Sequence, residues 1–255
     1  MKDKIEIILK ELNLFNPLDF EDYIHKMESI KEGMVFMDLI DELDEIGPEN
    51  ADWQMIYNAM SKDIEVSQIV TCYSNSLIYK EILQWLQKEG YCPKSFLELG
   101  CNNGLFSIAL SKLWDNAEIS GIDYASNAIK VAKNMANKYQ VSNSNFFHAD
   151  INIFESFKVL PKVDIIIAPF FFHEIISFQE NNWDAINGNI KLVSKKNTQL
   201  IAINRFHQAE SQCTQLSLNL LNSNFKEIYR ETIRIDSDHK NKESEYFPIQ
   251  VFSYN

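Results

Sequence analysis

The spacing of apolar residues predicts a helical first third of the chain. Before residue 90, apolar positions recur every three or four residues, as they do along one face of a helix. The expected helices cover residues 3–14, 17–30, 34–46 and 50–60. Pro17 fits the first turn of the second helix and Gly33 is expected to close it, whereas Gly47 and Pro48 end the third.

A fifth helix is expected before Gly90. Either Ser74 or Ser76 would cap its first turn, and Gly90 would end it. Tyr73 stands at its start. If these helices cover the mouth of an active site, Tyr57, Tyr73 or Tyr79 could contact a ligand, although packing between helices is the better explanation for each of them.

From residue 95, short apolar runs alternate with helical patterns, which is typical of a parallel sheet covered by helices on both faces. Strands are expected over residues 95–99, 117–123, 145–149, 163–168, 198–204, 226–234 and 245–253, and helices over residues 104–114, 126–139, 151–158, 180–194 and 207–222. Ser126 is a candidate cap for the second of these helices. The last two strands have no helix between them, so they are expected to pair antiparallel.

Charge divides the chain near the same boundary. The net charge is −12, and residues 1–90 hold 19 acidic against 8 basic residues, whereas residues 91–255 hold 17 against 16. Nucleic-acid affinity depends largely on Lys and Arg contacts to phosphate. An acidic first third and a nearly neutral remainder therefore argue against DNA or RNA as a partner.

The cysteines and the hydropathy bear on the compartment. Cys72, Cys92, Cys101 and Cys213 show no CxxC spacing, so buried reduced thiols are expected rather than a metal site or a disulfide framework. No apolar run reaches the roughly 18 residues that a membrane span needs, and the first residues do not form a secretory signal. A cytoplasmic protein without a membrane partner is expected, either a monomer or a homodimer.

The most informative stretch is the turn between residues 100 and 104. A short apolar strand, residues 96–99, runs through it into a helix, which is how α/β domains offer backbone N–H groups to an anionic ligand. A dinucleotide fingerprint would need glycine at the positions held by Asn102 and Leu105. Because both are substituted, a pyrophosphate is not the expected ligand.

The residues present, Glu98-Leu-Gly-Cys-Asn-Asn-Gly104, resemble motif I of the class I S-adenosylmethionine (SAM) methyltransferases. The departure is Asn102 at the middle glycine, and asparagine tolerates left-handed backbone angles better than most residues. The resemblance implies that Glu98, Gly100, Asn102 and Gly104 bind the amino-acid end of SAM.

Three later segments extend the resemblance. Asp123 ends the second strand 23 residues after Gly100, where the family places an acid that accepts from both ribose hydroxyls, and Tyr124 would lie against the adenine. His148-Ala-Asp150-Ile151 resembles the segment whose acid accepts from the adenine amino group, although Asp150 could instead cap a helical turn. Val163 to Phe170, which includes Pro169, resembles the fourth-strand motif that opens the substrate side.

Phe170-Phe-Phe-His173-Glu174 follows that strand and supplies the candidate acceptor site. The aromatic run could line an acceptor pocket, and His173 is the candidate general base because histidine accepts protons near neutral pH. A structural hydrogen-bonding pair with Glu174 is an equally good interpretation. Arg205 and His207, after the fifth strand, are weaker candidates.

The resemblance implies a Rossmann-like α/β fold with a seven-stranded, mostly parallel sheet and an antiparallel last strand, over residues 91–255, with residues 1–90 as a helical cap. It implies a SAM-dependent methyltransferase, with S-adenosylhomocysteine (SAH) as product, no metal, and a small-molecule acceptor whose O, N or C nucleophile stays open. The alternatives are a non-catalytic SAM-binding protein, a methyltransferase acting on a peptide or protein, and an enzyme that uses the sulfonium for another reaction.

Overall fold

A computed structural model describes residues 3–47, 52–177, 182–205, 209–235 and 245–255. Its seven strands form one sheet in the order β3-β2-β1-β4-β5-β7-β6. The chain divides into two compact units, which are described separately below. The first unit comprises residues 1–92, 101–116 and 123–148, and the second comprises residues 93–100, 117–122 and 149–255.

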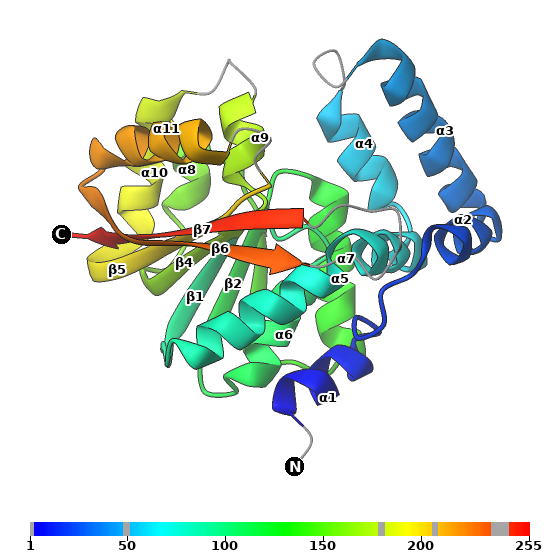
Figure 1. The fold of residues 1–255 in the computed structure, drawn as a ribbon, viewed down its shortest axis with the longest axis horizontal. Helices are drawn as coiled ribbons and strands as arrows, with labels where there is room; N and C mark the ends of the chain where they lie inside the picture. Colours follow the sequence, from blue (N-terminus) through cyan, green and yellow to red (C-terminus); the bar gives the residue numbers. More distant parts are fainter. Residues whose placement is uncertain (1–2, 48–51, 178–181, 206–208, 236–244) are drawn as a thin grey trace. The chain divides into compact units, whose positions relative to one another are not determined.

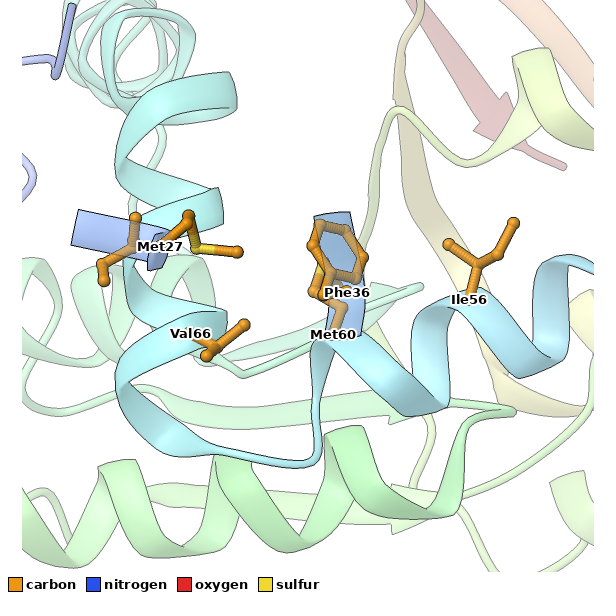
Figure 2. Close-up of a cluster of buried hydrophobic side chains, with 6 residues drawn as sticks. Met27, Phe36, Ile56, Met60 and Val66 are labelled. Carbon is orange, nitrogen blue, oxygen red and sulfur yellow. The ribbon is translucent and has the colours of Figure 1, made fainter. Parts of the chain in front are cut away.

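The first unit is mainly helical. Its helices are α1 (Lys4–Glu11), α2 (Phe20–Glu28), α3 (Lys31–Ile46), α4 (Trp53–Met60), α5 (Ile64–Lys88), α6 (Leu105–Leu113) and α7 (Ser126–Lys138), and its strand is β3 (Ser144–His148). Helix α3 packs against both α2 and α4 (Figure 1). Side chains from α2, α3, α4 and α5 bury a shared apolar cluster of Met27, Phe36, Ile56, Met60, Val66 and Ile69, most of which Figure 2 labels. Burial of these side chains holds the helices together.

The second unit contains most of the sheet. Its elements are β1 (Ser95–Leu99), β2 (Glu118–Asp123, whose last residue falls in the first unit), α8 (Phe154–Phe157), β4 (Val163–Pro169), α9 (Phe172–Ser177), α10 (Trp183–Val193), β5 (Ser194–Ile203), α11 (Ala209–Leu221), β6 (Phe225–Ile235) and β7 (Glu245–Tyr254). Strand β1 pairs in parallel with β2 and β4, and β4 pairs in parallel with β5. Strand β7 is antiparallel to both β5 and β6. The predicted fold class, with its antiparallel last strand, is confirmed.

The expectation for Gly33 was wrong. Gly33 does not end α2 but lies inside α3. A Cβ atom at this position would lie 2.3 Å from the carbonyl oxygen of Met27. Glycine is therefore needed for the close approach of α2 and α3, and not for helix termination.

The expected caps of two helices, and the expected place of Pro17 in the first turn of α2, were also wrong. Helix α5 is continuous from Ile64, so Ser74 and Ser76 lie in its interior, and the Asp63 side chain caps it by accepting from the N–H groups of Glu65 and Val66. Pro17 precedes α2, which Asp19 caps instead. Ser126 is the first residue of α7 and makes no cap, since the N-cap residue is Ala125 without a side-chain hydrogen bond.

Smaller differences concern element ends. Helix α9 was not expected, because its six residues are too few to show a helical period. Parts of the helices expected at 180–194 and 207–222, and residues 236–244 between the last two strands, lie outside the described residues. The division at residue 90 into cap and core stays a prediction.

Candidate functional site

The turn after β1 has the backbone shape that its sequence predicts. In the first unit, Asn102 lies in the left-handed region with φ of +47°, and Gly104 has φ of +74°. A Cβ atom on Gly104 would lie 2.7 Å from the Phe146 ring and 2.8 Å from the Ala132 side chain. Glycine is therefore required at 104, whereas asparagine is accommodated at 102, as predicted.

Asp123 connects this turn to the end of β2. Its side chain is 9% exposed, and its Oδ2 accepts from the backbone N–H of Asn102 at 2.9 Å. Its Oδ1 accepts from the backbone N–H of Ala125 at 2.8 Å. Burial raises the pKa of Asp123 above its ordinary value, although these N–H groups and the charge of His148 oppose the shift. The backbone N–H of Tyr124 also acts on this carboxylate, and the acceptor capacity that remains is available to a ligand hydroxyl.

The side chain of Asn102 contacts the end of α4. Its Oδ1 lies 3.5 Å from the Ser61 hydroxyl and its Nδ2 lies 4.0 Å from the Met60 sulfur. Ser61 is the C-cap residue of α4. The substituted glycine position of motif I is therefore occupied by a side chain that meets the N-terminal helices.

Tyr124, the residue after Asp123, lies among side chains of the first unit. Its ring meets the Tyr57 ring edge-on at 6.2 Å between centroids. His148 Nε2 lies 2.8 Å from the Tyr124 carbonyl oxygen. Helix α4 also reaches α7, because the Asn127 amide donates to the Asn58 carbonyl at 3.4 Å. Tyr57 is thus brought to Tyr124 by helix packing, which the sequence pattern alone did not indicate.

A hollow of about 360 Å³ opens beside these contacts, within the first unit. Its lining comes from the α4–α5 connection and from α7 and consists of Ser61, Lys62, Asp63, Ile64, Asn127, Lys130, Val131 and Asn134. The lining is largely polar, and both lysines are exposed.

Tyr73 lies elsewhere in the first unit. Its ring stacks on Tyr23 of α2 at 4.4 Å between centroids and lies 6.5 Å from Phe20. The face of α5 that carries Tyr73 is therefore packed against α2. Its assignment to the cofactor site stays a prediction.

In the second unit, Glu98 and Gly100 lie at the end of β1. Glu98 is 1% exposed within an otherwise apolar strand. Gly100 has φ of +70°, and a Cβ atom there would lie 2.9 Å from the Phe171 ring. Both the left-handed backbone and the close Phe171 side chain require glycine at 100.

Asp150 and Ile151 follow β3. Asp150 Oδ1 accepts from the backbone N–H of Asn152 at 2.8 Å, which forms a local turn. Helix α8 begins later, at Phe154, so Asp150 does not cap it. Ile151 is buried, and its carbonyl accepts from the Asn189 amide at 2.7 Å.

The end of β4 carries the aromatic run. Pro169 is its last residue, and Phe170 follows with φ of +58°, an unusual conformation for a bulky side chain. The backbone N–H of Phe170 donates to the Ile203 carbonyl at 2.7 Å and fixes this turn to β5. Strained backbone of this kind is concentrated at functional sites.

His173 and Arg205 both lie close to Phe170. The imidazole of His173 meets the Phe170 ring edge-on at 6.2 Å, and its Nδ1 is buried. The Arg205 guanidinium lies 5.3 Å from the Phe170 ring centroid and 5.4 Å from that of Phe247. Arg205 also pairs with Glu245 at 3.4 Å. The side chain of Glu174, and the whole of His207, lie outside the described residues.

Asn204 is a candidate that the sequence did not indicate. It follows β5, is fully buried, and neither amide atom has a hydrogen-bond partner in the described part of the chain. Its backbone N–H donates to the Pro248 carbonyl at 3.1 Å. Burying an unpaired amide costs roughly 1–3 kcal/mol, so a ligand or a water molecule that bonded this amide would be stabilised there.

No group of three or more His, Cys, Asp or Glu side chains among the described residues could hold a metal ion. No helix in the described part of the chain is both long and apolar enough to cross a membrane.

Comparison with known proteins identifies the domain type. A family model described as a methyltransferase domain matches residues 93–243. A SAM-dependent methyltransferase from Aquifex aeolicus is 17% identical with a TM-score of 0.52, over 68% of this chain and 89% of that one. The SAH-bound magnesium protoporphyrin IX methyltransferase of Synechocystis PCC 6803 is 15% identical with a TM-score of 0.50, over 76% and 86%.

A putative RNA methyltransferase from Pyrococcus horikoshii is comparably similar, with 16% identity and a TM-score of 0.51 over 71% of this chain and 83% of that one. No curated protein matches the sequence significantly. At these identities the solved structures share the fold, and their acceptors range from a porphyrin to RNA.

Proposed function

Because the chain belongs to the class I SAM-dependent methyltransferase family, we propose that it transfers a methyl group from SAM to a small-molecule acceptor. The observation that carries this proposal is the pairing of the left-handed turn at Asn102 with the buried carboxylate of Asp123. A dinucleotide site would need a closer backbone approach than Asn102 permits. A ribose diol needs only a carboxylate with free lone pairs, which Asp123 has.

We propose a part of SAM for each candidate residue of the site. In the first unit, we assign the ribose hydroxyls to Asp123, the adenine face to Tyr124, and the amino-acid end to Asn102 and Gly104. In the second unit, Glu98 and Gly100 are assigned to the amino-acid end, with Asp150, Ile151 and Pro169 completing the assignment by their motif positions. Support for Asp150 is weaker, because its carboxylate already holds a turn. Tyr73 remains a candidate, although its ring is stacked on Tyr23.

SAM, when bound, supplies an electrophilic methyl group on a sulfonium, so the protein needs neither a nucleophilic side chain nor a metal of its own. The chain must orient the acceptor, exclude water and remove a proton where the nucleophile carries one. We assign proton removal to His173. Its Nδ1 is buried, so Nε2 is the atom that would take the proton.

The acceptor side is proposed to include Phe170, Asn204 and Arg205. Phe170 supplies an aromatic wall, and the Asn204 amide offers a donor nitrogen and an acceptor oxygen that have no hydrogen-bond partner among the described residues. A neutral polar molecule would satisfy both amide atoms. The acidic balance of the chain supports a small molecule over a nucleic acid, since its net charge of −12 repels phosphate. The free state of all four cysteines supports a cytoplasmic location.

Two measurements test the proposal. Isothermal titration calorimetry with SAM and SAH should show one site per chain. Isotope-labelled methyl transfer from SAM into fractions of a metabolite extract should label a small molecule, which mass spectrometry identifies. Binding without transfer to any fraction would indicate a non-catalytic SAM-binding protein, and labelling confined to protein or RNA would contradict the small-molecule acceptor. Failure to bind either ligand would overturn the proposal as a whole.

A further inference from the structure

Asn103, the neighbour of Asn102, ties the cofactor turn to helix α5. Its side chain is 2% exposed, and its Nδ2 donates to the Thr71 hydroxyl at 2.8 Å and to the Ser67 carbonyl at 3.0 Å. Its Oδ1 accepts from the backbone N–H of Leu105 at 3.2 Å, where α6 begins. Both amide hydrogens and the amide oxygen are thus engaged, and all four residues belong to the first unit.

Thr71 is a specific partner and not a general surface contact. It is 3% exposed in the interior of α5. Without its hydroxyl, one hydrogen of the buried Asn103 amide would lose its acceptor, which costs more than an exposed hydrogen bond is worth. The helix that carries Thr71 is 25 residues long, so the anchor point is rigid.

We propose that Thr71 and Asn103 are positioning residues for SAM. Helix α5, which carries Thr71, is then part of the cofactor site, although Thr71 does not touch a reacting atom. This inference rests on the proposed function and adds to the site Thr71 of α5, which lies outside motif I. The turn between Cys101 and Gly104 holds Asn102 in a left-handed conformation that directs its N–H to Asp123. The bonds from Asn103 to α5 hold that turn in shape before the ligand arrives.

These bonds lower the entropic cost of ordering the turn when SAM binds. A turn that is fixed in advance loses little conformational freedom when SAM binds, whereas a loosened turn must be ordered at the expense of affinity. Helix α5 therefore contributes to the affinity for the cofactor through the buried hydroxyl of Thr71, without contacting the cofactor through that residue.

The central test is the affinity for SAH of the full-length chain, measured by titration calorimetry well below the unfolding temperature. Thr71→Val keeps the shape of the side chain and removes the hydroxyl, so we expect SAH to bind about tenfold more weakly. Thr71→Ser keeps the hydroxyl and should restore affinity to within about twofold of the wild type. If Thr71 had a purely structural role, SAH affinity would not depend on the presence of the hydroxyl in this way.

Two control variants lie on the same helix. Ser76 is 2% exposed and its hydroxyl has no partner in the described part of the chain, so Ser76→Ala should leave SAH affinity unchanged. Ile82 is fully buried, so Ile82→Val lowers stability away from the turn and should also leave affinity unchanged. A loss of affinity in Ile82→Val equal to that in Thr71→Val would show that stability alone accounts for the effect, and would overturn the proposal.

The variant Asn103→Asp provides an independent test of the same proposal. A carboxylate at 103 still accepts from the Leu105 N–H, but it cannot donate to the Ser67 carbonyl and is repelled by it. We expect a loss of SAH affinity at least as large as that of Thr71→Val. If either variant is folded by circular dichroism and binds SAH as tightly as the wild type, the positioning role is wrong. If the wild type itself does not bind SAH, the proposed function fails instead.

Discussion

The backbone N–H of Asn102 and the carboxylate of Asp123 are joined by a 2.9 Å hydrogen bond, so the residue that departs from motif I is held by the acid assigned to the ribose. Asp123→Ala removes both the diol acceptor and this bond. We expect SAH affinity to fall about a hundredfold, which corresponds to two lost hydrogen bonds to a charged group. Titration calorimetry measures the change, and Asp115→Ala, at an exposed carboxylate of the first unit, serves as the control.

Because burial raises the pKa of Asp123, this carboxyl takes up a proton at a higher pH than an exposed aspartate does. Protonation turns an acceptor oxygen into a donor, so SAH affinity should weaken as the pH falls through the raised pKa. The free energy of unfolding depends on pH in the opposite direction. Because the pKa of Asp123 is higher in the folded than in the unfolded chain, this group stabilises the fold at pH values below its unfolded-state pKa, and the contribution is lost as the pH rises through its folded-state pKa.

The measurement is SAH affinity at several pH values, with Asp123→Asn as the variant that should abolish this component of the pH dependence. His148 is the charged neighbour that also acts on Asp123. His148→Gln removes this charge and serves as the control. A pH dependence that survives Asp123→Asn and disappears in His148→Gln would assign the effect to the histidine.

The sheet could be predicted from sequence because its strands are local apolar runs with clear ends. Strand β1 was expected at residues 95–99 and β4 at 163–168, and the structure extends only the second, to Pro169. Caps were harder to predict, because Ser76 and Ser126 have the chemistry of N-cap residues but lie inside helices. A capping side chain is recognised only once the start of the helix is known.

The contacts of the site depend on packing between distant segments and left no pattern in the sequence. Asn103 meets Thr71, 32 positions away, and Tyr57 meets Tyr124. Asn204 reads as an ordinary loop residue, and only its burial without partners draws attention to it. Gly33 misled because a glycine required by a close helix contact looks the same as one that ends a helix.

The reactivity of each cysteine should depend on whether its side chain is buried in the fold. Cys92 is exposed, whereas Cys72, Cys101 and Cys213 are buried. Burial raises the pKa of Cys213 to about 11, so its reactive thiolate is scarce at neutral pH. Iodoacetamide followed by mass spectrometry should label Cys92 alone in the native chain and all four cysteines after denaturation. Native labelling of Cys213 in the Cys92→Ser variant would contradict the packing of α11 against the sheet.

Asn204→Leu removes an amide that has no partner in the described part of the chain. We expect the unfolding temperature to rise by about 2–6 °C, because an unsatisfied buried group is replaced by an apolar one of similar size. Gln250 is an equally buried amide, but its Nε2 donates to the Cys213 carbonyl. Gln250→Leu should therefore lower the unfolding temperature. Scanning calorimetry measures the unfolding temperature of both variants, and opposite changes would distinguish an amide available to a ligand from one that stabilises the fold.

The same Asn204→Leu variant should lose methyl transfer into the extract fraction that the wild type labels, with SAH affinity unchanged. Full transfer at a raised unfolding temperature would show that the amide is not used by the acceptor. A lowered unfolding temperature would instead indicate that a buried water bonds the amide.

His173 lies edge-on to Phe170, which follows β4 and has a left-handed backbone. His173→Ala should lower the rate of methyl transfer by about a hundredfold or more if the imidazole removes a proton, and should leave SAH affinity within about twofold. His25→Ala, in α2, is the matched control and should change neither quantity. The rate of His173→Ala should also recover partly in added imidazole, because a small base can enter the space that the side chain leaves. An unchanged rate, or a loss of both rate and SAH affinity without imidazole rescue, would make His173 a structural partner of the aromatic run.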